Sequence, residues 1–174
     1  MHKVSHPLVI FLTLLCSSFT YLIIQNWVLG ETYSVKFINP EASGTFTRMT
    51  ADISFSETDL PDSKFDVQID VNSLDMGSPE MSKEALSPDM LNARRFSKIQ
   101  FLSANISKTD RGFLAKGSLE LHGIKKDIEI PFTFLSKTFA GSFDIKAKDY
   151  GINSLGNGAE DILRIELSVP VKEK

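Results

Sequence analysis

The stretch FLAKGSLELHGIKKDIEIPFTF, residues 113–134, contains two alternating runs on either side of a short turn. Apolar residues such as Phe113 and Leu119 share one parity of the first run, whereas Lys116 lies on the other. Because successive side chains of a strand point to opposite faces, each run predicts a strand with one apolar and one polar face. The dipeptide His122-Gly123 between the runs favours a turn, so the stretch predicts a β-hairpin.

The same alternation recurs along most of the chain. Many evenly spaced antiparallel strands without long helices indicate a sandwich or a closed barrel. About eight strands are expected, and eight is the number at which a barrel interior holds either packed side chains or one small ligand. Further regular runs cover residues 65–71, 128–134, 139–147 and 163–171, and less regular ones lie near 33–39, 44–56 and 98–108.

One helical interruption is predicted over residues 78–86. Ser78 is suited to cap it, Pro79 is suited to its first turn, and Pro88 ends it. We therefore expect an all-β chain that forms an eight-stranded antiparallel, lipocalin-like β-barrel with one short helix, preceded by an N-terminal signal or anchor helix.

The first thirty residues differ in character from the rest of the chain. Lys3 is the one charged residue among them, and residues 8–29 are mostly apolar. This pattern is typical of an export signal cleaved before Glu31. The alternative is an uncleaved membrane anchor, because a helix over residues 8–29 would be about 33 Å long. The expected division is a signal peptide or anchor over 1–30 and a barrel over 31–174, in a protein that is periplasmic, secreted or tethered to the membrane by residues 8–29.

Composition excludes several functions. With 19 basic and 22 acidic residues the chain has a net charge of −3, so it lacks the general positive field that attracts nucleic acid. Without residues 1–30 the chain has no cysteine and one histidine, His122. A disulfide framework and a thiol nucleophile are then impossible, and one histidine does not fill the usual zinc sets. We expect no metal and no cofactor.

Several motifs follow one another in a specific order. The segment Tyr33–Phe37 reads YSVKF, Lys116–Lys126 reads KGSLELHGIKK, Ile130–Phe132 reads IPF, and Asp149–Ile152 reads DYGI. In this order and spacing the chain from Tyr33 to Val171 resembles the YceI-like family, bacterial proteins with a lipocalin-like barrel that bind polyisoprenoid lipids. The resemblance implies that the protein binds a polyisoprenoid or an isoprenoid quinone inside the barrel and is not an enzyme.

The chain departs from the family pattern in the predicted helix. Met81 and Glu84 occupy the places where the family commonly has an arginine and a histidine. A lipid head group that those two side chains hold in relatives would meet a different surface here.

Phenylalanine supports an apolar ligand independently of the resemblance, since 11 of the 13 phenylalanines lie after residue 30. Gly117 and Gly141 share the inward parity of their strands, which favours room inside the barrel. The alternative is a filled core without a ligand, in a periplasmic or surface interaction module. The candidate residues of the apolar cavity are Phe46, Phe55, Phe65, Val67, Ile69, Phe101, Phe113, Gly117, Phe132, Phe139, Gly141 and Phe143.

A quinone or diphosphate head group would need polar partners at the mouth of the barrel. Arg94, Arg95 and Lys98 form a basic cluster that suits a phosphate, although exposed basic residues are commonly only solvated. The one conceivable catalytic triad would join His122 with Asp127 and a serine such as Ser118. The histidine lies in a predicted turn and no nucleophile elbow surrounds the serine, so we expect no catalytic residues.

Overall fold

The computed structural model describes residues 24–152 and 161–174. Within these ranges the chain is almost entirely β, with one α-helix, α1 (Pro79–Ala85), and two 3-10 helices, η1 (Val71–Ser73) and η2 (Ala147–Tyr150). The strands are β1 (Asn26–Leu29), β2 (Ser34–Ile38), β3 (Ser43–Phe46), β4 (Met49–Ser54), β5 (Lys64–Asp70), β6 (Leu74–Asp75), β7 (Lys98–Thr109), β8 (Gly112–Leu121), β9 (Ile124–Leu135), β10 (Thr138–Lys146) and β11 (Ile162–Glu173).

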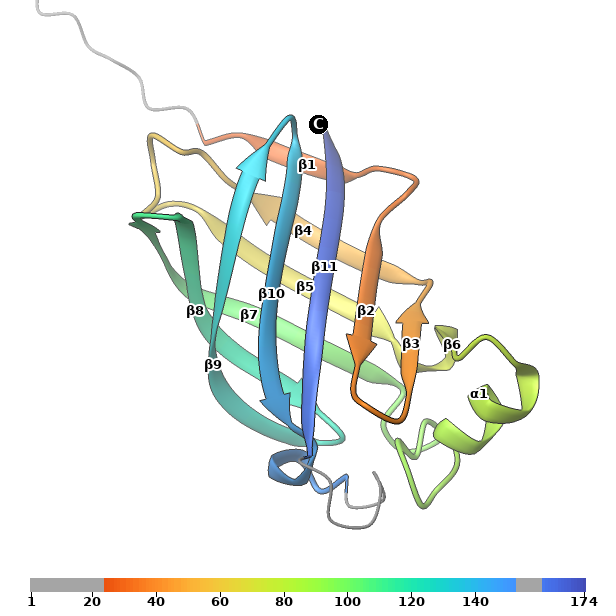
Figure 1. Cartoon of the computed structure of the whole chain (residues 1–174). Helices are drawn as coiled ribbons and strands as arrows, with labels where there is room; N and C mark the ends of the chain where they lie inside the picture. The colour runs from red at the N-terminus through yellow and green to blue at the C-terminus, as the bar shows by residue number, and fades with distance from the viewer. Residues whose placement is uncertain (1–23, 153–160) are drawn as a thin grey trace, which may run out of the picture.

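These strands close into a barrel with eight segments in its wall, because three segments are each divided into two strands. β1 and β2 lie end to end along β11, β3 and β4 pair with β2 and β1 respectively, and β5 continues through η1 into β6. The other five segments are β7 to β11. β1 closes the ring by pairing antiparallel with both β4 and β11 (Figure 1). The predicted eight-stranded antiparallel barrel is confirmed.

The alternation of apolar and polar residues in the sequence matches the alternation of buried and more exposed side chains in the strands. Along β8, five buried residues alternate with residues that are half-buried or exposed. The turn between β8 and β9 has positive φ angles at His122 (53°) and Gly123 (74°), and the β9–β10 turn has them at Ser136 (50°) and Lys137 (57°). Turns with two such residues match the right-handed twist of antiparallel strands and fix the hairpin register.

Helix α1 begins where the sequence predicts. The Ser78 hydroxyl accepts a hydrogen bond from the Met81 amide at 3.2 Å, and Pro79 occupies the first turn. Figure 1 shows α1 and the segment after it at one end of the barrel, opposite the end where β1 meets the C-terminus. The two ends of the barrel are therefore built differently.

The barrel begins earlier than the boundary predicted after Gly30. Asn26–Leu29 forms β1, whereas the sequence suggested the end of a leader helix. The Trp27 indole is buried and its Nε1 donates a hydrogen bond to the Phe55 carbonyl at 2.9 Å. A short apolar run does not distinguish a leader from a buried strand, which explains the misplaced boundary. The leader itself, up to residue 23, lies outside the described residues, and no helix in the described part is long and apolar enough to cross a membrane.

Candidate ligand-binding site

The barrel contains a cavity of about 240 Å³ whose lining residues are all apolar. Strands from every side of the wall contribute, for example Ala51 of β4, Leu119 of β8 and Leu167 of β11. Apolar cavities of this kind stay free of water and accept apolar molecules. The interior is thus suited to a hydrocarbon group.

Most of the predicted cavity residues lie on this cavity. They share the inward parity of their strands and come from β3, β5, β7, β9 and β10. The strands on which they lie are spread around the barrel, so the closed topology brings together residues far apart in the sequence. Those on the lining are Phe46, Phe65, Val67, Ile69, Phe101, Phe132, Phe139 and Phe143.

Phe55 and Phe113 point inward but do not line the cavity. Phe55 is 1% exposed, and its ring centroid lies 5.2 Å from those of Phe113, Phe134 and Phe139, in edge-to-face geometry. Trp27 of β1 contacts Phe134 in the same way, also at 5.2 Å. Such contacts are stable arrangements of aromatic rings. We call Trp27, Phe55, Phe113 and Phe134 the aromatic plug, because they fill the barrel at the β1 end.

Gly117 and Gly141 do not leave room inside the barrel, so the prediction that they enlarge the cavity was wrong. A Cβ atom at Gly117 would collide with the carbonyl oxygen of Leu102, at a bulge where β7 shifts its register between Ser103 and Asn105. A Cβ atom at Gly141 would come within 2.5 Å of the Pro131 carbonyl oxygen. Both glycines permit close approach of the neighbouring strand, which is the other common use of a glycine in a strand.

The end of the cavity opposite the plug is formed by residues outside the predicted cavity set, although Met90 and Leu91 had been considered as residues that shape the entrance. Met76 follows β6, Ala85 lies in α1, and Met90 and Leu91 lie in the segment after the helix. Apolar residues in the largely polar stretch 78–92 were the available signal. A helix of this length has no clear apolar stripe, so their common direction could not be predicted.

The three predicted head-group residues lie outside the cavity. Arg94, Arg95 and Lys98 are all exposed, and none of them lines the cavity. The Arg95 guanidinium lies 5.1 Å from the centroid of the Phe96 ring, and the Lys98 ammonium donates to the Gln68 side chain at 3.2 Å. Their contact with a head group stays a prediction.

His122 has a structural role. Its Nδ1 lies 3.0 Å from the Tyr150 carbonyl oxygen, which only accepts, so Nδ1 donates the hydrogen bond. The ring packs edge-to-face on Phe96 at 4.5 Å, and Nε2 is buried without a partner among the described residues. The pKa of the Tyr150 phenol is raised, mainly because the side chain is buried and secondly because of the negative charge of Asp149. The conceivable triad is not assembled, because His122 Nδ1 is bonded to a backbone carbonyl.

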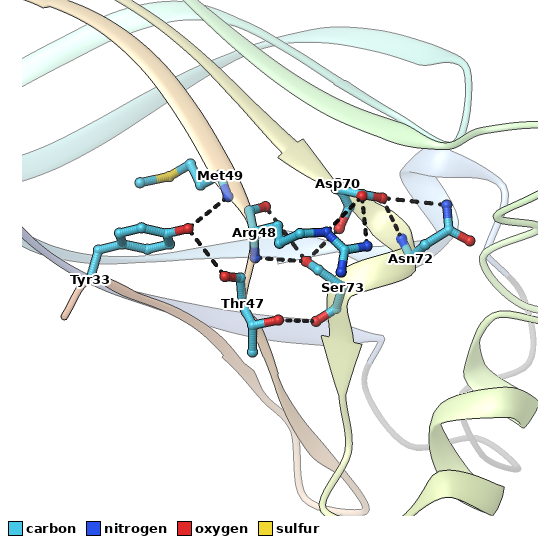
Figure 2. A network of polar contacts seen from close by, with 7 residues as sticks. All are labelled: Tyr33, Thr47, Arg48, Met49, Asp70, Asn72 and Ser73. Atoms are coloured by element: carbon cyan, nitrogen blue, oxygen red, sulfur yellow. Dashed lines mark hydrogen bonds and ion pairs between the residues drawn. The ribbon is translucent and has the colours of Figure 1, made fainter. Parts of the chain in front are cut away.

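A polar network holds the wall where β1–β2 separates from β3–β4 (Figure 2). The Tyr33 hydroxyl accepts a hydrogen bond from the Met49 amide at 3.0 Å and donates one to the Thr47 carbonyl at 3.1 Å. The Tyr33 side chain therefore bridges the two segments between the β2–β3 pairing and the β1–β4 pairing. Since Met49 also lines the cavity, the network fixes the wall beside the site.

The second half of the network joins Arg48, the residue before β4, to Asp70 at the end of β5. Arg48 donates to Asp70 through Nη2 at 2.8 Å and Nε at 3.0 Å, and the Asn72 amide donates to the same carboxylate at 2.9 Å. The hydrogen bond from Arg48 lowers the pKa of the Asp70 carboxyl. On the outer face Arg164 lowers the pKa of Asp144 in the same manner. These pairs are exposed and belong to the wall, not to a catalytic site.

In residues 24–152 and 161–174, no three histidine, cysteine, aspartate or glutamate side chains are grouped so that they could hold a metal ion. The residues that line the cavity are all apolar.

A closed antiparallel barrel around an apolar cavity, with one short helix at its end, defines a lipocalin-like β-barrel protein. The family model described as the YceI-like domain matches residues 28–171, and the chain belongs to this family. The resemblance drawn from the sequence motifs is confirmed.

Relatives and solved structures agree with this assignment. A UPF0312 protein of Vibrio parahaemolyticus is 30% identical over 127 residues, covering 67% of this chain and 67% of the relative. A UPF0312 protein of Vibrio cholerae is 30% identical over 142 residues, covering 75% and 74%.

Among solved structures, Burkholderia cenocepacia BcnA has a TM-score of 0.71 at 20% identity, over 80% of this chain and 96% of that one. A polyisoprenoid binding domain from Saccharophagus degradans has a TM-score of 0.63 at 14% identity, over 87% and 100%. At these identities the likenesses establish the fold.

Proposed function

We propose that the protein binds a lipid with an apolar chain, a polyisoprenoid or an isoprenoid quinone, inside the barrel and sequesters or carries it. The observation that carries the proposal is the apolar cavity of about 240 Å³ within a YceI-like barrel. The Saccharophagus degradans neighbour, which is a polyisoprenoid binding domain, supports the same class of ligand.

The free energy of such binding comes from the chain of the lipid. Burial of each CH₂ group stabilises the complex by about 0.8 kcal/mol, and the apolar lining has no polar group to desolvate. Binding, rather than catalysis, is the role that this lining supports.

The alternative of a filled barrel that serves as an interaction module has one feature in its favour. The aromatic plug fills the β1 end with packed rings. The cavity that continues beyond the plug favours the lipid-binding role, because packed protein interiors have few voids larger than a water molecule.

We also infer that the chain is exported, on the basis of the apolar run from Leu8 and the basic Lys3. Because β1 belongs to the barrel, a cleavage site compatible with the fold precedes Asn26. The intact mass of the protein from its own host should match a chain that retains Trp27. A mass equal to residues 31–174 would contradict this placement.

Native mass spectrometry of protein purified from its own host tests lipid binding. We expect a stoichiometric adduct that solvent extraction removes and identifies as an isoprenoid. Ala51→Phe places a ring in the cavity from β4 and should abolish the adduct. The matched control, Thr50→Phe, adds the same ring one residue earlier at an exposed position and should keep it. A folded protein without any adduct, or equal adducts in both variants, would overturn the proposal.

A further inference from the structure

The cavity is closed at the β1 end of the barrel. Phe65, Phe132 and Phe139 line it, and Phe55 lies behind them at centroid distances of 6.0, 5.7 and 5.2 Å. Phe55 itself is off the lining and 1% exposed. These three rings therefore form the floor of a blind pocket.

Two further layers lie behind the floor. Phe134 packs on Phe139 at 4.4 Å, and Trp27 packs on Phe134 at 5.2 Å. The hydrogen bond from Trp27 to the Phe55 carbonyl ties this stack to the wall. A chain that enters the pocket cannot pass to the β1 end without displacing several packed aromatic rings, which is costly in a densely packed interior.

The opposite end is built from more adaptable side chains. Met76 and Met90 line the cavity there, with Leu91, and all three are half-buried. Methionine is unbranched and flexible, and it adapts to ligands of different shape. We therefore expect a ligand to enter and leave at this end, with its head group beside α1.

The volume of the pocket limits how much of the ligand is inside. An apolar cavity of about 150 Å³ holds a benzene molecule, which has six carbon atoms. On the same scale the cavity of about 240 Å³ holds about ten carbon atoms, the equivalent of two isoprene units.

We propose that the protein binds only the terminal segment of a prenyl chain, about ten carbon atoms deep against the Phe65–Phe132–Phe139 floor, and leaves the rest of a longer chain outside at the α1 end. This inference rests on the proposed function and narrows it. The pocket recognises a chain terminus and does not measure the length of the lipid.

Competition of prenyl alcohols of increasing length against radiolabelled geraniol tests this inference. From five to ten carbons we expect Kd to fall more than about tenfold, because the added carbons are buried. From ten to twenty carbons Kd should change less than about threefold, because the added carbons stay outside the pocket. A continued tenfold fall for each isoprene unit up to twenty carbons would overturn the inference while leaving lipid binding intact. Absence of binding at every length would overturn lipid binding as well.

A matched pair of variants tests the floor directly. Phe65→Leu deepens the floor and should shift the plateau, so that the fifteen-carbon alcohol binds at least about fivefold more tightly than geraniol. Phe46→Leu makes the same change on the lining beside Val35 and Leu74, away from the floor, and should leave the plateau at ten carbons. Thermal unfolding verifies that each variant is folded. If Phe65→Leu does not fold, Phe139→Leu replaces it as the floor variant. An identical plateau in the floor and wall variants would overturn the inference.

Discussion

Phe55 shows how far the role of a single residue follows from the sequence. It was a candidate for the inward face on a less regular run, where the direction of the side chain stayed open, and it is 1% exposed. Its position along the barrel axis did not follow, because the alternation of a strand defines a face and not a depth. Depth depends on the register between strands, and this register places Phe55 in the aromatic plug.

Gly117 is the residue whose role the sequence suggested wrongly. It has the inward parity of β8, but the bulge in β7 brings the carbonyl of Leu102 against it. A bulge is a property of two strands together, so a single alternating run does not reveal it.

Replacement of this glycine tests the account of the bulge. Gly117→Ala should lower the free energy of unfolding by about 1–3 kcal/mol, because the added methyl group overpacks the wall. Urea denaturation measures the change, and Glu120→Ala at an exposed position of the same strand should change it by less than about 0.5 kcal/mol. Equal effects of the two substitutions would contradict the assignment.

The ion pair between Arg48 and Asp70 predicts a dependence of stability on acid pH. Its hydrogen bonds hold the pKa of Asp70 below 3.8, the ordinary value for aspartate. Ionised Asp70 therefore stabilises the folded chain above pH 3.8, and this contribution is lost as the pH falls through the lower folded pKa. Because both side chains are exposed, the contribution is below about 1 kcal/mol.

Urea titrations of the unsubstituted protein and Asp70→Asn, between about pH 7 and pH 2, measure this dependence. The difference in free energy of unfolding should be constant near neutral pH and should disappear in acid. Arg48→Gln should remove the same pH-dependent part. A difference that persists unchanged at the lowest pH would show that Asp70 acts by another route.

At the scale of elements, the regular strands could be predicted and the short ones could not. The runs from Phe113 to Phe134 appear as β8 and β9 with the expected turn, and Ser78 caps α1. β6 has two residues, too few for any periodic signal. β1 has four residues that continue an apolar leader, so their pattern suggested a different element.

Removal of β1 tests its place in the barrel. A chain that begins at Glu31 loses the strand that joins β4 to β11 and the indole that packs on Phe134. Two strand edges then remain unpaired, and such edges promote association. We expect this chain to lose cooperative thermal unfolding or to aggregate, whereas a chain that begins at Ile24 should unfold cooperatively.

The single substitution Trp27→Phe provides a milder version of the same test. It keeps an aromatic ring but removes the hydrogen bond to Phe55, which should cost about 1 kcal/mol.

The truncated chain that begins at Glu31 gives the contradicting outcome. If that chain unfolds with an unchanged Tm, β1 is not part of the stable barrel.

At the scale of the whole molecule, the barrel and its apolar interior followed from the sequence, and the shape of the cavity did not. Strand number and parity predicted a closed wall with phenylalanines inside. The closed end of the cavity arises from rings of the floor and the aromatic plug on four strands and one loop, which meet only in the folded barrel. These rings include Phe55, Phe65, Phe113, Phe132 and Phe139. The cavity, about 240 Å³, is what remains after these rings pack.

The central claim is that an apolar chain binds inside this barrel. Intermolecular nuclear Overhauser effects between bound geraniol and protein methyl groups test it most directly. We predict contacts to the lining methyl groups of Ala51, Ala115 and Met49 and none to Leu135, which is 70% exposed on the outside. Contacts confined to exposed residues such as Leu135 and Met81, with none to the lining, would contradict the account.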